Sequence, residues 1–370
     1  MKKIVIIAGI VILVVAGVLF IVIPLATSKM VESRLSEAFD SAGIPEEIWN
    51  VGSARYFPIP GRIVIKNLVF GDDYEDFQAK VKRLTFTSNL KNTDIFKGSA
   101  RAKKVLFLAD EVNISVGSIC VNGFMLDLSE LNYGLGMSAV KKLKNIRVNN
   151  VEYKQRGSTY FSLKKMNTNI GYTQGKIPLS TSISMKDLIL DVRRLLNISS
   201  GLNTEYRFSN LSYKNKISKG VSNADLDITL ADLFNTKINI VFSFPPEFDT
   251  SGSVENLAMI DFEEDLKMVS LVFNYNDKSF LDHILRLAKV NKKYAVEMLN
   301  ETFMEMAIMS GFDSDRFVKE ATNFIVKPKK LELKIIPDYP LSLNDITDDL
   351  FDSNLSLSIN GGKPFRNNQK

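Results

Sequence analysis

The chain opens with a run of 20 uncharged residues, Ile4 to Ile23, in which Ile, Val and Leu predominate. At about 1.5 Å per residue, such a helix reaches roughly 30 Å, the thickness of a bilayer's hydrocarbon core. A cleaved secretory signal is the alternative, because Lys2 and Lys3 precede the run and Ala26 to Ser28 resemble a cleavage site. The run exceeds the roughly 7–15 apolar residues of a signal peptide. The sequence therefore predicts an uncleaved membrane anchor over residues 1–28.

A short amphipathic helix is predicted next, over residues 29–45. Its apolar residues recur at helical spacing, and Gly43 follows them as a stop signal: Val31, Leu35, Ala38, Phe39 and Ala42. This stem helix either lies on the membrane surface or packs on the first strands, and packing is the more common outcome.

Between Gly61 and Asp277 the hydropathy period changes to two, which predicts about ten β-strands. The alternation is clearest in Val112 to Val116, Asp225 to Leu230 and Ser270 to Tyr275. We assign residues 46–277 to a β-rich domain. The chain is thus predicted to be mostly β (α+β), with a helical segment following the sheet.

A weaker pattern recurs inside these strands, in which an apolar residue lies two places before an Asn or Gly and another lies one place after it. The central residues are Asn67, Gly123, Asn150, Asn210 and Asn256. In a regular strand these two apolar residues would face opposite sides, and a one-residue bulge would bring them to one face. Asn and Gly tolerate the left-handed backbone that some bulges require. The alternative is coincidence in a chain rich in Asn.

After Asp277 the period becomes helical again, within a predicted segment over residues 278–370. Helices are predicted near 279–290, 294–309 and 313–325, and strands at 330–336 and 354–359. Methionines gather in the middle helix at Met298, Met304, Met306 and Met309. Such flexible side chains suit a surface that accepts acyl chains or varied partners, although they fill cores more often.

The charge pattern excludes few functions but argues against nucleic acid as a partner. The chain has 47 basic and 42 acidic residues, a formal charge of +5. Basic residues are interspersed with acidic ones along the sequence rather than gathered in one stretch, so no nucleic-acid partner is predicted. The numbers of basic residues before and after the anchor are nearly equal, so they do not decide its orientation in the membrane. The short N-terminal tail and the single cysteine favour a C-terminal domain outside the cytoplasm.

Candidate catalytic residues are few. His283, the only histidine, lies in a predicted helix beside Asp282, and Cys120, the only cysteine, lies between Ile119 and Val121 in a strand. The sequence suggests no basic neighbour for this thiol, so both residues are predicted to be structural.

Other polar motifs lack the context that catalysis or ion binding requires. They comprise two serine-x-x-lysine spacings, a short glycine pair and three acidic pairs: Ser138/Lys141, Ser162/Lys165, Gly134/Gly136, Asp72-Asp73, Glu263-Glu264 and Asp348-Asp349. We therefore predict no catalytic, cofactor-binding or metal-binding residues, and a protein that is not an enzyme.

The order of these parts resembles the AsmA-like proteins of bacterial cell envelopes. The matching stretches are a spanning helix, a stem, a short strand with an aromatic-proline loop, and three following strands: Ile4 to Leu25, Val31 to Ala42, Val51 to Pro58, Gly61 to Leu68, Ala79 to Phe86 and Ala102 to Leu108. They cover roughly the first third of the chain. The helices after Asp277 depart from the repetitive β stack of larger members.

This resemblance implies an inner-membrane anchor, a body in the periplasm, and a curled antiparallel sheet with an apolar concave groove. It implies no catalytic residues. Two functions are carried forward: binding or transport of membrane lipid through its acyl chains, and an anchored scaffold for other envelope or outer-membrane assembly proteins.

The strand composition favours the lipid-handling function. Gly61 to Phe70, Val105 to Leu108 and Ile238 to Phe244 are apolar on both faces for part of their length. Three helices of roughly 18 to 24 Å cannot cover a sheet that extends roughly 48 Å. The remaining apolar surface is expected to form a trough that accepts acyl chains.

Overall fold

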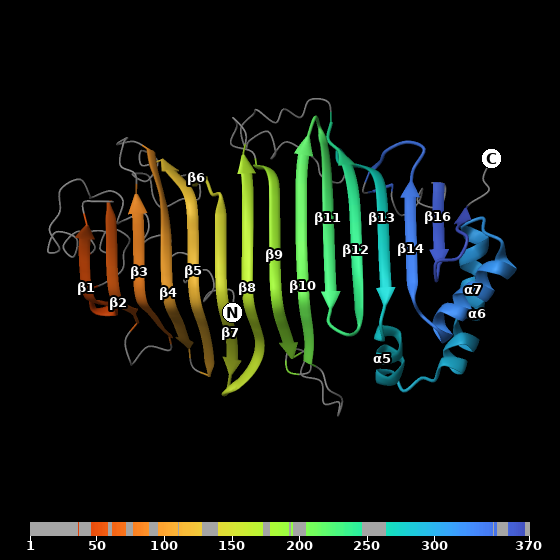
Figure 1. Ribbon diagram of the computed structural model, residues 1–370, viewed down its shortest axis with the longest axis horizontal. Coiled ribbons are helices and arrows are strands. Elements are labelled where there is room, and N and C mark those ends of the chain that lie inside the picture. The colour runs from red at the N-terminus through yellow and green to blue at the C-terminus, as the bar shows by residue number, and fades with distance from the viewer. Residues whose placement is uncertain are drawn as a thin grey trace. The chain divides into compact units, whose positions relative to one another are not determined.

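The computed structural model describes residues 36, 46–57, 61–71, 77–88, 95–109, 111–127, 140–172, 178–191, 194, 205–245, 264–342, 344–345 and 354–366 (Figure 1). Some predicted features lie outside these ranges: the anchor at 4–23, the stem apart from the helical Ser36, Ser138, Gly134/Gly136, Asn256, Asp72-Asp73, Glu263 and Asp348-Asp349. Within the described ranges, no helix has both the length and the hydropathy of a membrane span.

The described chain is mostly antiparallel β-structure with few helices, as predicted. It divides into two compact units, which we call unit 1 (residues 1–170 and 187–197) and unit 2 (residues 171–186 and 198–370). The predicted domain limits at residues 28, 45 and 277 stay predictions.

Unit 1 is built on a sheet in the order β1-β2-β3-β4-β5-β7-β8, with every neighbouring pair antiparallel and β6 beside the end of β5. A short 3-10 helix at Glu46–Ile48 precedes it. The strands are β1 (Trp49–Phe57), β2 (Arg62–Phe70), β3 (Phe77–Ser88), β4 (Ile95–Ala109), β5 (Val112–Asp127), β6 (Val140–Lys142), β7 (Asn145–Gln155) and β8 (Ser158–Tyr172).

A row of unusual backbone crosses this sheet. On β2, β4 and β7 the residues Asn67, Lys104 and Asn150 have positive φ, at 51°, 52° and 53°. Each of these residues interrupts the ladder, but the strands pair in the same register before and after it. On β1 and β2, for example, Val51 pairs with Leu68 and Ser53 pairs with Lys66. Each left-handed residue lies opposite a residue of ordinary backbone on the neighbouring strands. We call the whole line the αL row: Gly52, Asn67, Lys82, Lys104, Gly117, Asn150 and Lys164.

The αL row changes the phase of side-chain alternation in every strand that it crosses. A strand normally alternates its side chains with period two, and a left-handed residue interrupts that alternation. As a result Ile65 and Leu68 lie in one buried core cluster with the equivalent pair Ala102/Val105, and half-buried Val148 and Val151 both pack against this cluster. Two successive polar residues then face the other side of the sheet.

The predicted face-sharing is therefore confirmed at Asn67, Gly123, Asn150 and Asn210, although the proposed bulge is found at only some of them. True register shifts occur beside Gly123, between β4 and β5, and beside Asn210, between β10 and β11. At Asn67 and Asn150 no residue is inserted, so the bulge predicted there is wrong. The neighbouring strands break phase in the same row, which removes the need for an extra residue.

The strands of unit 2 pair in the order β9-β10-β11-β12-β13-β14-β16-β17, with β15 beside β13. Its strands are β9 (Pro178–Asp191, whose last residues belong to unit 1), β10 (Glu205–Ser218), β11 (Val221–Leu230), β12 (Phe234–Ser243), β13 (Lys267–Asp277), β14 (Lys330–Ile336), β15 (Leu341–Ser342), β16 (Asn354–Ile359) and β17 (Phe365–Arg366).

Three helices connect β13 to β14 (Figure 1): α5 (Phe280–Leu287), α6 (Lys292–Met309) and α7 (Ser314–Val326). They confirm the three predicted helices. Side-chain caps fix two of the starts, because Asn291 Oδ1 accepts from the Tyr294 amide at 2.8 Å and Asp313 Oδ1 accepts from the Arg316 amide at 3.1 Å.

Candidate functional site

The single cysteine is buried in β5, as predicted, but its surroundings differ from the prediction. The Nε of Arg101 on β4 donates to the Cys120 Sγ at 3.0 Å. The two residues face each other in the β4–β5 ladder. The expectation that this thiol has no basic neighbour was wrong, because strand pairing brought together residues that are distant in sequence.

His283 serves as a contact between a helix and a strand. Its Nε2 lies 2.9 Å from the hydroxyl of Tyr206 on β10, and the two rings meet edge to face with centroids 5.6 Å apart. Ser162 and Lys165 lie on β8, so the lysine is not one helical turn from the serine. Within the described ranges, no three His, Cys, Asp or Glu side chains converge as metal ligands would.

The first candidate site is an apolar cavity of about 430 Å³ in unit 2, between α6, α7 and the strands β14 and β16. We call it the helix cavity. Ser310 is the single polar residue among the described residues that line it: Leu299, Phe303, Met306, Ser310, Phe312, Phe317, Ala321, Phe324, Ile325, Leu331, Leu333, Ile335, Leu355, Leu357 and Ile359.

Strand alternation explains the apolar wall of this cavity. Leu331, Leu333 and Ile335 pair directly with Ile359, Leu357 and Leu355 across the β14–β16 ladder. Because every second residue of a strand faces the same side, these six side chains form one continuous surface toward the helices. The intervening residues, such as Glu332 and Ser358, face away.

The same apolar face continues across the sheet of unit 2. Ile335 pairs with Leu271, which pairs with Ile240, and Leu333 pairs with Phe273, which pairs with Ile238. These side chains on β12 and β13 are only half-buried. We call this surface the apolar strip, made of Ile238, Ile240, Leu271, Phe273 and Leu226 on β11. It leads toward the helix cavity.

One polar group stands at the end of this strip. The Tyr275 hydroxyl donates to Asp277 Oδ2 at 2.5 Å, and the same oxygen accepts from the Leu281 amide at 3.1 Å. Partial burial, followed by the bond to Asp277, raises the pKa of Tyr275 well above its ordinary value. The phenol is therefore held in its neutral, donating form.

The methionines of α6 are mostly on the surface. Met298, Met306 and Met309 are 60%, 47% and 59% exposed, and Ile308 is 66% exposed. The favoured prediction, that these methionines fill a core, was wrong. Only Ala295 and Ala307 of α6 are fully buried, because small residues allow the helix to approach α7 and the sheet closely.

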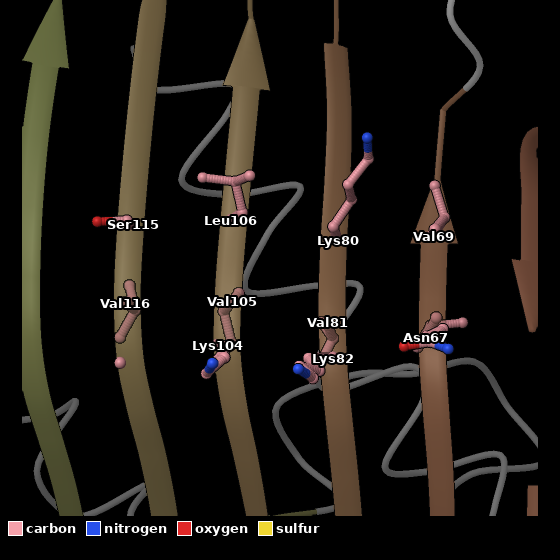
Figure 2. A pocket seen from close by; sticks show the side chains of 12 residues that line it. Asn67, Val69, Lys80, Val81, Lys82, Lys104, Val105, Leu106, Ser115 and Val116 are labelled. Carbon is pink, nitrogen blue, oxygen red and sulfur yellow. The ribbon is translucent and has the colours of Figure 1, made fainter. Parts of the chain in front are cut away.

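The second candidate site is a shallow depression of about 610 Å³ in unit 1, which follows the αL row across β2, β3, β4 and β5 (Figure 2). We call it the cationic depression. It combines lysines with aliphatic side chains: Asn67, Leu68, Val69, Lys80, Val81, Lys82, Lys104, Val105, Leu106, Ser115, Val116 and Gly117.

Strand register gathers basic residues beside this depression. Lys66 pairs with Arg83, which pairs with Lys103, and Lys82 lies opposite Lys104 in the neighbouring line. We call these the cationic rows, which continue on β8 with Lys164 and Lys165. The expectation that basic residues are dispersed among acidic ones is therefore wrong for unit 1. Their dispersal in sequence becomes a cluster in space, because one polar doublet from each strand falls in the same two rows.

Neither site is apparent from the sequence alone, for one reason. The doublets Lys66-Asn67, Lys82-Arg83 and Lys103-Lys104 are visible in the sequence, each between apolar residues three apart. Aligning them requires the strand register, which local periodicity does not give. The helix cavity likewise depends on how α6 and α7 pack on β14 and β16.

Comparison with known proteins gives no family for this chain. No family model matches it. An alignment 139 residues long, which covers 33% of the chain, shows 30% identity to the outer kinetochore KNL1 complex subunit spc7 of Schizosaccharomyces pombe. The chain spans about 10% of the length of that relative.

Proposed function

We propose that this protein is a non-catalytic, membrane-anchored protein of the bacterial cell envelope that binds a lipid acyl chain in the helix cavity. The observation that carries the proposal is the composition of that cavity, in which Ser310 is the one polar residue among 15 lining residues. Its volume of about 430 Å³ falls within the range of pockets that hold small ligands.

The chemistry of the cavity suits a hydrocarbon chain. Cavities lined by Leu, Ile and Phe stay dry and accept apolar molecules. A methylene chain needs no hydrogen-bond partner, and its transfer from water contributes about 0.8 kcal/mol per buried CH₂ group. A polar substrate would leave its donors and acceptors unsatisfied against Phe317, Phe324 and Leu357, so it is disfavoured.

The apolar strip offers a route to this cavity. Its half-buried side chains on β11, β12 and β13 lie in the same face as the cavity wall on β14. A chain lying along the strip would keep apolar contacts as it moves. With the resemblance to AsmA-like proteins, this supports an anchor in the inner membrane and a domain in the periplasm that binds or moves lipid.

The exposed surface of α6 favours a second candidate, an anchored scaffold for other envelope proteins. Met298, Ile308 and Met309 are exposed, and the same helix exposes Glu301 and Glu305. Flexible apolar side chains among carboxylates suit a partner surface that is both apolar and basic.

Photo-crosslinking in membranes tests the lipid proposal. The full chain is expressed in cells fed a diazirine-bearing fatty acid, irradiated, digested and mapped by mass spectrometry. Adducts are expected on the peptides that contain Leu331 to Ile335 and Leu355 to Ile359. Ala321→Trp, which fills the cavity, should reduce these adducts at least about tenfold, and the milder Ala321→Leu should reduce them partially.

Val326→Trp is the matched control, because it adds the same indole to α7 at a position that is 43% exposed. It should leave labelling unchanged. Absence of adducts on both strands in the wild-type chain would overturn the lipid proposal in favour of the scaffold.

A further inference from the structure

The cationic depression lies over the polar face of unit 1, the face that carries Lys82 and Lys104. The core residues Leu68, Val81, Val105 and Val116 also belong to its lining, each between residues of the polar face. Val69, Lys80, Leu106 and Ser115 form one cross-strand row on this face, next to the αL row. Figure 2 shows the labelled side chains standing on four neighbouring strands, β2 to β5. Half-buried Val69 and Leu106 thus lie beside the exposed Lys82 and Lys104.

The positive charges at this site are not compensated within the described part of the chain. Lys66 faces Arg83, Arg83 faces Lys103, and Lys82 lies opposite Lys104. Like charges directly opposite each other destabilise a sheet. Among the described residues, an ion pair is found in the cationic rows only at Lys164, whose Nζ lies 3.5 Å from Asp187 Oδ2. An anion bound over β3 and β4 would relieve this repulsion.

Lys104 is an unexpected residue for its backbone. Among the described residues of unit 1, the other non-glycine left-handed positions in the middle of strands are Asn67, Asn150 and Asp187, whose short polar side chains tolerate that conformation. Lysine has no such advantage, so its left-handed backbone (φ 52°) costs stability. Residues that keep such strain cluster at functional sites. The strained backbone therefore makes Lys104 a candidate functional residue.

We propose that the cationic depression binds an amphiphile whose phosphate-bearing head group has a net negative charge, with the phosphate between Lys82 and Lys104 and the apolar part against Val69 and Leu106. Lysine ammonium groups bind phosphate through charge-assisted hydrogen bonds. The aliphatic side chains beside them would add contacts that a free phosphate cannot make. Among the described residues, no aromatic side chain lines the depression to stack with bases, so this lining does not favour single-stranded nucleic acid. The site is in unit 1, and the proposal does not depend on the helix cavity.

Native mass spectrometry of the full chain, released from a non-ionic detergent, tests the proposal with three probes. Phosphatidylglycerol should bind at least about tenfold more tightly than phosphatidylcholine of the same acyl chains, because only the former carries net negative charge. It should also bind at least about tenfold more tightly than glycerol 3-phosphate, which lacks the apolar part. Equal affinity for the two lipids, or for the lipid and glycerol 3-phosphate, would overturn the proposal.

The decisive variant is Lys104→Asn. It should be at least as stable as the wild type, because Asn suits the left-handed backbone, yet weaken phosphatidylglycerol binding about tenfold. Lys82→Gln combined with Lys104→Asn should abolish the preference over phosphatidylcholine. The control Lys97→Gln/Lys216→Gln removes two exposed charges elsewhere and should keep that preference. Unchanged preference in the first double variant, or its loss in the control, would also overturn the proposal.

Discussion

Left-handed residues in the middle of the strands of unit 1 show how a single position can set the phase of a whole strand. At Asn67 and Asn150 the residue type reveals this role, because Asn tolerates positive φ. The sequence therefore predicted that the residues around them share a face. It did not identify Lys104, whose residue type gives no such signal, or Asp187, because the recurring pattern was defined by Asn and Gly alone. Gly52 and Gly117 are explained only by pairing, because a Cβ on either would lie 3.1 Å from an Asn Cβ across the ladder.

Substitutions at Asn67 should follow the cost of its backbone. Asn67→Gly should leave the stability of unit 1 unchanged or slightly raised, whereas Asn67→Val should destabilise it by about 1–2 kcal/mol. The measurements are the thermal unfolding midpoint and amide hydrogen exchange in β2. Asn113→Val, at a regular strand position of β5, is the control and should be tolerated because β-branched residues suit strands. Equal effects of Asn67→Val and Asn113→Val would contradict the assignment.

At the scale of elements, local periodicity was a sufficient guide in the C-terminal part. The strands predicted at 330–336 and 354–359 match β14 and β16, and the three helices were located correctly. Each of these elements is specified by its own residues. The exposure of α6 was not predicted, because it depends on which face finds a partner. At the junction of β13 and α5, Asp277 accepts both the Tyr275 hydroxyl and the Leu281 amide, which links the strand to the helix.

The raised pKa of Tyr275 predicts a loss of stability at alkaline pH. In the unfolded chain this tyrosine ionises near its ordinary pKa of about 10, while the folded state retains the proton. Its contribution to stability is therefore fully present below about pH 10 and decreases as the pH rises above that value. Tyr275→Phe should show a shallower decrease between about pH 9.5 and 11 than the wild type. The measurement is the thermal unfolding midpoint of unit 2 at each pH. Tyr294→Phe, on exposed α6, is the control, and identical pH profiles for Tyr275→Phe and the wild type would contradict the prediction.

At the scale of the whole molecule, what the sequence could not provide is the alignment of distant segments. The cationic rows take residues from β2, β3, β4 and β8, and the helix cavity takes residues from two helices and two strands. Each contributing segment looks ordinary alone. Both candidate sites come from long-range pairing, which explains why the sequence predicted a mostly β protein but neither site.

The predicted anchor at residues 4–23 makes a claim about topology. If it spans the inner membrane with the domain in the periplasm, alkaline phosphatase fused after Lys370 should be active, because that enzyme folds only outside the cytoplasm. A green fluorescent protein fusion at the same point should be dark when exported unfolded. The mature chain should also keep its N-terminus. Recovery of a soluble product that starts near Lys29 would show instead that residues 1–28 are a cleaved signal.

The αL row also constrains how this sheet can evolve. A strand that lost its phase change would turn half of its apolar side chains to the wrong face, while its neighbours kept theirs. One substitution cannot remove the row, since the break would have to disappear from every strand together. Homologues of this protein should therefore vary most at the exposed positions above and below the row. The residues of the row itself should be conserved together. Insertions should be admitted in the connecting loops and rejected within the strands.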